Sequence, residues 1–155
     1  MKQRRLEMPK RFIIEGINWR SVIFSDEKYF ALNEFDAYYC WIYKDQFIFQ
    51  QDNCQFLVFG YFKKKFMENN IRLLQWPPYS PDLNIIENIW LILSNYIYSG
   101  EKIRNLRELK DHIKCGVTRF NETQKSTVDN LYTSIQSKLV DVIIKRGDRL
   151  IKKIV

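Results

Sequence analysis

The sequence predicts one α/β domain, a short sheet with flanking helices and a helical C-terminal portion. Short aromatic and β-branched runs occupy the first half of the chain, and longer stretches with helical spacing of apolar residues dominate the second half. At 155 residues, 46% of them hydrophobic, the chain is long enough to bury a core and fits one domain better than two.

Strands are expected where short apolar runs lead to acidic residues. Residues 22–30 are predicted to form a strand that carries Asp26, and residues 47–51 a strand that ends on Asp52. Residues 38–43 are equally β-prone, and a further short strand is expected over 71–76.

Helices are expected where apolar residues recur with a period near 3.6. Residues 77–82 must form a loop, because its prolines fix φ and lack an N–H donor. Asn69 and Asn70 are the expected stop of the first helix, and Gly100 and Gly147 close later ones. The expected helices span residues 56–69, 84–98, 105–119 and 124–146.

The net charge of +7 lies at the two ends of the chain. Residues 1–20 and 138–155 each carry six basic and two acidic side chains, whereas the middle is nearly neutral. This pattern suits a polyanion held at the periphery, and it suits equally two solvated segments that aid solubility. The candidate nucleic-acid-binding residues are Lys63, Lys64, Lys65, Lys145, Arg146, Arg149, Lys152 and Lys153.

Other classes of protein are disfavoured by composition. Cys40, Cys54 and Cys115 are odd in number and widely spaced, which predicts neither a disulfide framework nor a zinc site. No apolar stretch approaches the roughly 18 residues of a bilayer span, and no charged-then-apolar leader opens the chain. We therefore expect a soluble, unsecreted protein in a reducing compartment that is not bound to a membrane.

Three acids stand where elements end or begin: Asp26, Asp52 and Glu87. Hard divalent cations prefer oxygen ligands on rigid elements, so such acids suit a metal site for phosphoryl transfer. Each acid also has a simpler interpretation. The two aspartates suit solvated strand ends, and Glu87 stands three residues after Asn84, the spacing of a capping box. His112, the single histidine, is expected to be a surface residue rather than a ligand.

The sequence segments around these acids are specific to one family. Residues 24–30 (FSDEKYF), 49–53 (FQQDN) and 76–90 (WPPYSPDLNIIENIW) resemble the three catalytic blocks of mariner-type DDE transposases. Between Asp52 and Glu87 lie 34 residues, a spacing typical of one large branch of that family. The resemblance continues through Val142 to Gly147 and so covers most of the chain.

The resemblance implies a ribonuclease-H-like fold with a mixed sheet. It also implies that Asp26, Asp52 and Glu87 are catalytic residues that bind Mg²⁺ or Mn²⁺ for DNA cleavage and strand transfer, in the nucleus. Asp82 is expected to be an acid at the start of the Glu87 helix rather than a ligand. The expected organisation is a basic N-terminal segment over 1–20, a shortened catalytic core over 21–100 and C-terminal helices over 101–155.

This chain departs from the family pattern in three ways. Family members carry helix-turn-helix domains ahead of the catalytic domain, whereas twenty-five residues precede Asp26, so we do not expect sequence-specific recognition of an element end. Leu57 stands where the family usually has a histidine. Twenty-five residues separate Asp26 from Asp52, far fewer than in the family, so part of the sheet edge is expected to be missing. Together these departures suggest a decayed or internally deleted copy.

Three functions remain open from the sequence. The first is a metal-dependent DNA nuclease and strand transferase, which in this copy has either kept or lost its activity. The second is a non-catalytic remnant that binds nucleic acid, and the third is a fragment that pairs with itself or with a full-length transposase. Two sheet arrangements also compete. Residues 38–43 either lie between the strands of Asp26 and Asp52 or stay outside them. We expect the second, with the two aspartate strands parallel and hydrogen-bonded, because the apolar run over 47–51 suits a central strand.

Overall fold

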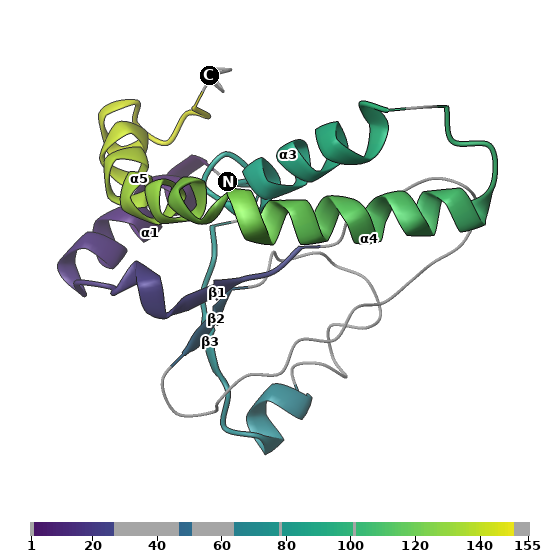
Figure 1. Cartoon of the computed structure of the whole chain (residues 1–155). Coiled ribbons are helices and arrows are strands. Elements are labelled where there is room, and N and C mark those ends of the chain that lie inside the picture. Colours follow the sequence, from purple (N-terminus) through teal and green to yellow (C-terminus); the bar gives the residue numbers. More distant parts are fainter. Residues whose placement is uncertain (1, 27–46, 51–63, 78, 101, 151–155) are drawn as a thin grey trace.

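The computed structural model describes residues 2–26, 47–50, 64–77, 79–100 and 102–150. Within them, helices and a short parallel sheet confirm the predicted α/β class (Figure 1). The three parallel strands are consistent with part of a ribonuclease-H-like sheet. The strand expected over 38–43 lies outside the described residues, and so does the shortened connection between the two aspartates.

The elements follow the predicted order closely. Residues 64–68 are helical and form the described part of the helix expected over 56–69, and Asn70 ends it with a φ of 54°. The elements are α1 (Lys2–Ile14), the 3₁₀ turn η1 (Trp19–Ser21), β1 (Val22–Phe24), β2 (Ile48–Gln50), β3 (Arg72–Leu74), α3 (Ile86–Tyr98), α4 (Leu106–Thr123) and α5 (Lys125–Ile144).

The sheet has the order β1-β2-β3, and both pairs are parallel. Phe24 pairs with Gln50, which in turn pairs with Leu74. The strands that lead to Asp26 and Asp52 are therefore direct neighbours, as expected. The alternative, in which another strand separates them, is wrong.

Two clusters of buried side chains hold the molecule together. The larger cluster joins the sheet to α1, α5 and the loop before α3. The smaller one lies between α3 and α4, which run side by side away from the sheet (Figure 1). The larger cluster contains Phe12, Trp19, Val22, Phe24, Trp76, Leu83, Ile85, Ile135, Leu139 and Val142.

The helix α1 was not expected, because residues 2–14 looked like a solvated basic segment. It packs against α5 and buries Arg5, Pro9 and Phe12. These positions have helical spacing, but an arginine and a proline occupy two of them and hide the apolar stripe. The stacking of Phe12 on Trp76, with ring centroids 5.9 Å apart, ties this helix to the sheet side of the core.

Local signals explain where the later helices begin and end. Asn105 caps α4, accepting from the N–H of Glu108 at 2.9 Å, while the Glu108 carboxylate accepts from the N–H of Arg104 at 2.7 Å. Past the end of α5, Gly147 has a φ of 86° and donates its N–H to the carbonyl of Val142 at 2.8 Å. The predicted stop at Gly147 is thus confirmed. No helix among the described residues is long and apolar enough to cross a membrane.

Candidate active site

The first two expected site residues follow the carboxyl ends of β1 and β2 in the sequence. Asp26 is half-buried and lies two residues beyond Phe24, the last residue of β1, so it stands just past the strand that was expected to carry it. Asp52 lies the same number of residues beyond Gln50, the register partner of Phe24, but Asp52 itself is outside the described residues. The carboxyl ends of parallel strands share one edge of a sheet, where open α/β sheets bind their ligands.

Ser25 ties the two strand ends together just before the aspartates. Its backbone N–H donates to the carbonyl of Gln50 at 3.2 Å, and its hydroxyl donates to the same oxygen at 2.8 Å. This second bond fixes β1 against β2 at the residue that precedes Asp26. Sequence reasoning missed this role of Ser25.

Glu87 is the second residue of α3, in the first turn and half-buried. The capping-box interpretation of Glu87 is wrong, because the N–H of Asn84 donates to the carbonyl of Pro81 at 3.2 Å instead. The Asn84 side chain accepts from the N–H of Ile86 at 3.4 Å. Within the described part of the chain, the Glu87 carboxylate has no hydrogen-bond or ion-pair partner, so helix capping does not occupy it.

One core cluster supports both described acids. Phe24, two residues before Asp26, and Ile85, two residues before Glu87, belong to the same group of buried side chains. Trp76 belongs to the same cluster and makes an edge contact with Phe24, with ring centroids 5.7 Å apart. The end of β1 and the start of α3 are therefore packed on a shared apolar base.

The donor set fits a hard divalent cation but is incomplete within the described residues. No group of three His, Cys, Asp or Glu side chains that could hold a metal ion occurs among the residues that the structure describes. Asp26, just past β1, and Glu87, in the first turn of α3, are two of the expected carboxylates, and the third expected ligand, Asp52, lies outside the described residues. Carboxylates of this kind are the usual ligands of Mg²⁺.

Gln50, at the carboxyl end of the middle strand, is an unusual residue. Its side chain is fully buried, and neither its amide nitrogen nor its amide oxygen has a hydrogen-bond partner in the described structure. A buried amide without partners costs free energy and calls for an explanation. Gln50 is the last residue of β2 and stands two residues before Asp52 in the sequence.

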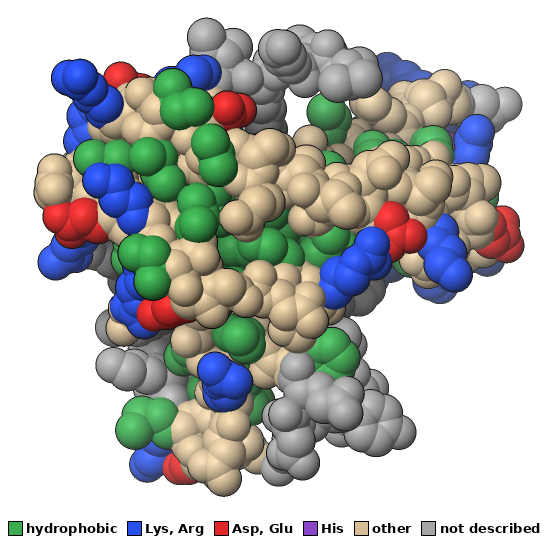
Figure 2. Space-filling view, turned by 90° about the vertical axis from the view of Figure 1, so that its left-hand side faces the viewer, with side chains coloured by type: hydrophobic (Ala, Val, Ile, Leu, Met, Phe, Trp, Pro, Cys, Tyr) green, Lys and Arg blue, Asp and Glu red, His purple; other side chains and the backbone are tan. Residues whose placement is uncertain are grey.

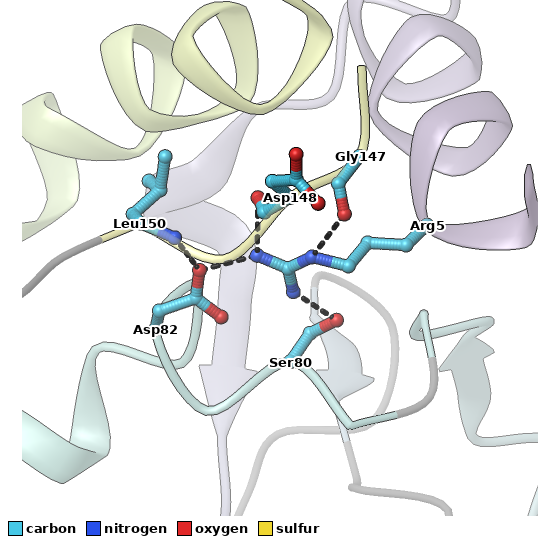
Figure 3. Close-up of polar contacts among 6 residues, drawn as sticks. All are labelled: Arg5, Ser80, Asp82, Gly147, Asp148 and Leu150. Carbon is cyan, nitrogen blue, oxygen red and sulfur yellow. Dashed lines mark hydrogen bonds and ion pairs between the residues drawn. The ribbon is translucent and has the colours of Figure 1, made fainter. Parts of the chain in front are cut away.

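The proline-rich loop before α3 is anchored by a buried ion pair. Asp82 was expected at the helix start, but it lies four residues before the first residue of α3, and this expectation is wrong. The Asp82 carboxylate instead pairs with Arg5 of α1 and accepts from the N–H of Leu150 at 2.8 Å (Figure 3). Arg5 also donates to the hydroxyl of Ser80.

The predicted nucleic-acid-binding residues fall in two places. Lys64 and Lys65 are exposed and lie 4.0 and 3.2 Å from carboxylate oxygens of Glu68, which partly offset their charge. At the end of α5, three of the predicted basic residues are exposed: Lys145, Arg146 and Arg149. Basic side chains are dispersed among acidic and apolar ones on the face in Figure 2. Lys63, Lys152 and Lys153 lie outside the described residues.

His112 has a structural place rather than the expected surface one. It is half-buried, and its Nδ1 lies 3.0 Å from the carbonyl oxygen of Ile97 in the last turn of α3. This contact needs the tautomer that carries a proton on Nδ1. It joins α4 to α3 and leaves His112 away from the expected ligand set.

Part of the chain is similar in sequence to known proteins. Residues 44–110 match a family of DDE superfamily endonucleases. The Tc3 transposase of Caenorhabditis elegans is 32% identical over 106 residues, which are 68% of this chain and 31% of that protein. The Tcb2 transposase of Caenorhabditis briggsae is 29% identical over 101 residues, 65% of this chain and 36% of that protein.

A third relative, the Tcb1 transposase of Caenorhabditis briggsae, is 29% identical over 109 residues, which are 70% of this chain and 34% of that protein. The chain thus spans about a third of the length of these curated relatives. The chain carries a DDE superfamily endonuclease domain over residues 44–110 and is distantly similar to the Tc3 and Tcb transposases.

Proposed function

We propose that this domain cuts DNA by hydrolysis of a phosphodiester and joins the freed 3′-hydroxyl to target DNA. Asp26, Asp52 and Glu87 are the proposed catalytic residues and the proposed ligands of Mg²⁺ or Mn²⁺. The observation that carries the proposal is the parallel pairing of Phe24 with Gln50, because each aspartate follows its strand by the same two residues.

The chain's own residues supply the rigidity that such chemistry needs. Ser25 holds the strand end before Asp26 with two bonds to one carbonyl, and Glu87 sits in a helix whose start is packed into the core. The three carboxylates would hold the cations. When bound, the cations activate the attacking oxygen and stabilise the leaving oxygen of the phosphodiester.

The test is metal-dependent nicking of supercoiled plasmid DNA by the wild type and by Asp26→Asn, Asp52→Asn and Glu87→Gln. Each variant removes a negative ligand with little change of shape, so each is expected to abolish nicking and to weaken Mn²⁺ binding in a calorimetric titration. The matched controls are Asp111→Asn and Glu122→Gln, which change exposed carboxylates of α4.

The outcomes separate the proposed functions. Equal nicking by the wild type and Asp52→Asn would refute the catalytic assignment. Binding of Mn²⁺ without nicking would indicate an assembled but inactive site. Binding of DNA without binding of Mn²⁺ would favour a non-catalytic DNA-binding remnant. The exposed side chains of Lys145, Arg146 and Arg149 support this second function, because they can bind DNA phosphates.

The partners and the compartment are part of the same proposal. DNA is the proposed partner, a second copy of the chain or a full-length transposase is the proposed protein partner, and the nucleus is the proposed compartment. Sedimentation of the chain alone, and with a full-length relative, tests the protein partner, because a complex sediments faster than the single chain.

A further inference from the structure

One buried arginine connects three segments that are far apart in the sequence (Figure 3). The Arg5 side chain is 6% exposed and that of its ion-pair partner Asp82 is 8% exposed. The guanidinium also donates to the hydroxyl of Ser80 and, at 3.1 Å, from Nε to the carbonyl of Gly147. A longer contact of 3.5 Å reaches the carbonyl of Asp148.

The Asp82 carboxylate also binds a second segment of the chain. Asp82 Oδ2 accepts both from Arg5 and from the N–H of Leu150, which lies beyond the end of α5. Through this oxygen and one guanidinium, α1, the loop before α3 and the chain after α5 meet at a single point (Figure 3). The loop therefore has polar attachments to both ends of the described chain.

The loop that Arg5 holds leads directly to Glu87. Ser80 and Asp82 precede Glu87 by seven and five residues. Between the prolines, Tyr79 is 68% exposed and has a φ of 52°, a backbone conformation that bulky residues rarely adopt. Such a conformation persists where the surroundings impose it, and Arg5 binds the very next residue.

Apolar burial alone does not explain this arrangement. Leu83 and Ile85 are almost completely buried, but apolar contacts are non-directional and do not set the path of a loop. A guanidinium fork is directional. A buried ion pair is also a poor stabiliser compared with apolar residues of similar size, which points to a geometric role rather than to stability.

We propose that Arg5 is a positioning residue for Glu87. By fixing Ser80 and Asp82 it sets the path of the loop and hence the orientation of the first turn of α3 relative to Asp26. This inference rests on the proposed metal-binding role of Glu87, and it makes a helix that precedes all three catalytic blocks part of the catalytic apparatus.

The test uses two variants of the full chain. Arg5→Lys keeps the positive charge but loses the fork, and the double variant Arg5→Met with Asp82→Leu replaces the ion pair by apolar side chains. Urea unfolding shows which variants are folded. The matched control is Lys2→Met, which removes the exposed pair between α1 and Asp148, with side chains 62% and 63% exposed, and leaves the loop untouched.

Two readouts follow on the folded variants. Amide hydrogen exchange over residues 79–90 is expected to become about tenfold faster, while exchange in α4 stays unchanged, because the loss is local. The affinity for Mn²⁺ is expected to fall by about tenfold, a loss typical of removing a residue that orients a metal ligand. Lys2→Met is expected to change neither quantity.

The two proposals fail in different ways. Exchange over residues 79–90 equal to that of the wild type, in both Arg5→Lys and the folded double variant, would overturn the positioning role. A wild type that binds no Mn²⁺ would overturn the metal site, and the exchange rates would still decide whether Arg5 positions α3. Faster exchange with unchanged Mn²⁺ affinity would overturn the link between Arg5 and Glu87.

Discussion

Phe24 and Gln50 face each other in parallel register on adjacent strands. This pairing shows that no strand lies between the two strands that lead to Asp26 and Asp52. A strand inserted there would have moved these two strands two strand spacings apart. A parallel pair needs a crossover connection, and the chain between the strands is long enough to provide one. The two strands that lead to the aspartates are therefore neighbours with a connection of this length.

Gln50→Leu is expected to raise the free energy of unfolding by about 1–3 kcal/mol. Leucine has a similar volume, and it removes the two buried amide atoms that have no partner in the described structure. Urea unfolding measures the change. The control is Gln50→Glu, which adds a charge at the same buried place and is expected to destabilise. A loss of stability in Gln50→Leu would show that the amide has a partner in solution.

Gly147→Ala is expected to lower the free energy of unfolding by about 1–3 kcal/mol. An added Cβ would lie 2.7 Å from the carbonyl oxygen of Lys2, and the backbone has a φ of 86°. Gly16→Ala separates these two effects, because Gly16 has a φ of 61° but no atom within 4 Å of the added Cβ. Equal losses in thermal or urea unfolding would mean that the contact with α1 contributes nothing.

The free energy of unfolding is expected to depend on pH in the alkaline range because of Tyr132. Its hydroxyl donates to the carbonyl of Val22 at 3.1 Å, and burial raises its pKa above 10.0, an effect that Arg20 partly offsets. Because the folded pKa exceeds the unfolded one, the contribution is complete below about pH 10 and is lost as the pH rises through the folded pKa.

Tyr132→Phe is therefore expected to cost about 0.5–1.5 kcal/mol near neutral pH, the contribution of an ordinary hydrogen bond. The variant should lose less stability than the wild type between about pH 9 and about pH 11. Urea unfolding across this range tests both statements. A difference between the two proteins that does not depend on pH would show that Tyr132 does not titrate differently in the folded state.

Much of the fold was predictable because its signals are local. The helix that carries Glu87 and the stop at Gly147 follow from apolar periodicity, proline chemistry and the conformational freedom of glycine. The pairing of the two aspartate strands was expected from the family resemblance and from the apolar run over 47–51. The assignment of the three acids came from the resemblance to a family, because 18 acidic residues offer many other combinations. It stays a prediction, since Asp52 lies outside the described residues.

The long-range polar contacts were not predictable. Arg5 and Asp82 are separated by 77 positions, and nothing near either residue indicates a buried partner. Arg5 is also a reason why α1 was not predicted, since an arginine at a buried helical position interrupts the apolar stripe in the sequence. The place of half-buried His112 was also not predicted, because its partner is a backbone carbonyl of another helix, far away in the sequence.

DNA binding is expected to be non-specific and strongly dependent on salt, because the basic residues lie at the ends of the chain. Changing Lys145, Arg146, Arg149, Lys152 and Lys153 to glutamine should lower the slope of log K against log salt by about 0.9 for each DNA phosphate that the variant no longer neutralises. Fluorescence anisotropy with a labelled duplex measures this slope. Arg107→Gln with Lys114→Gln, on α4, removes two positive charges at another place and shows how much of the effect per charge is due to net charge alone.

Lys64 and Lys65 should contribute less to this slope per charge than the residues after α5. Glu68 carboxylate oxygens lie within 4.0 Å of both ammonium groups, so a phosphate that binds there has to compete with an acid already in place. Lys145, Arg146 and Arg149 have no acidic partner among the described residues and stay available. Lys64→Gln with Lys65→Gln is thus expected to leave the slope nearly unchanged. A larger drop in slope for this pair than for the five-residue variant would place the DNA along the helical segment at 64–68 instead of at the end of α5.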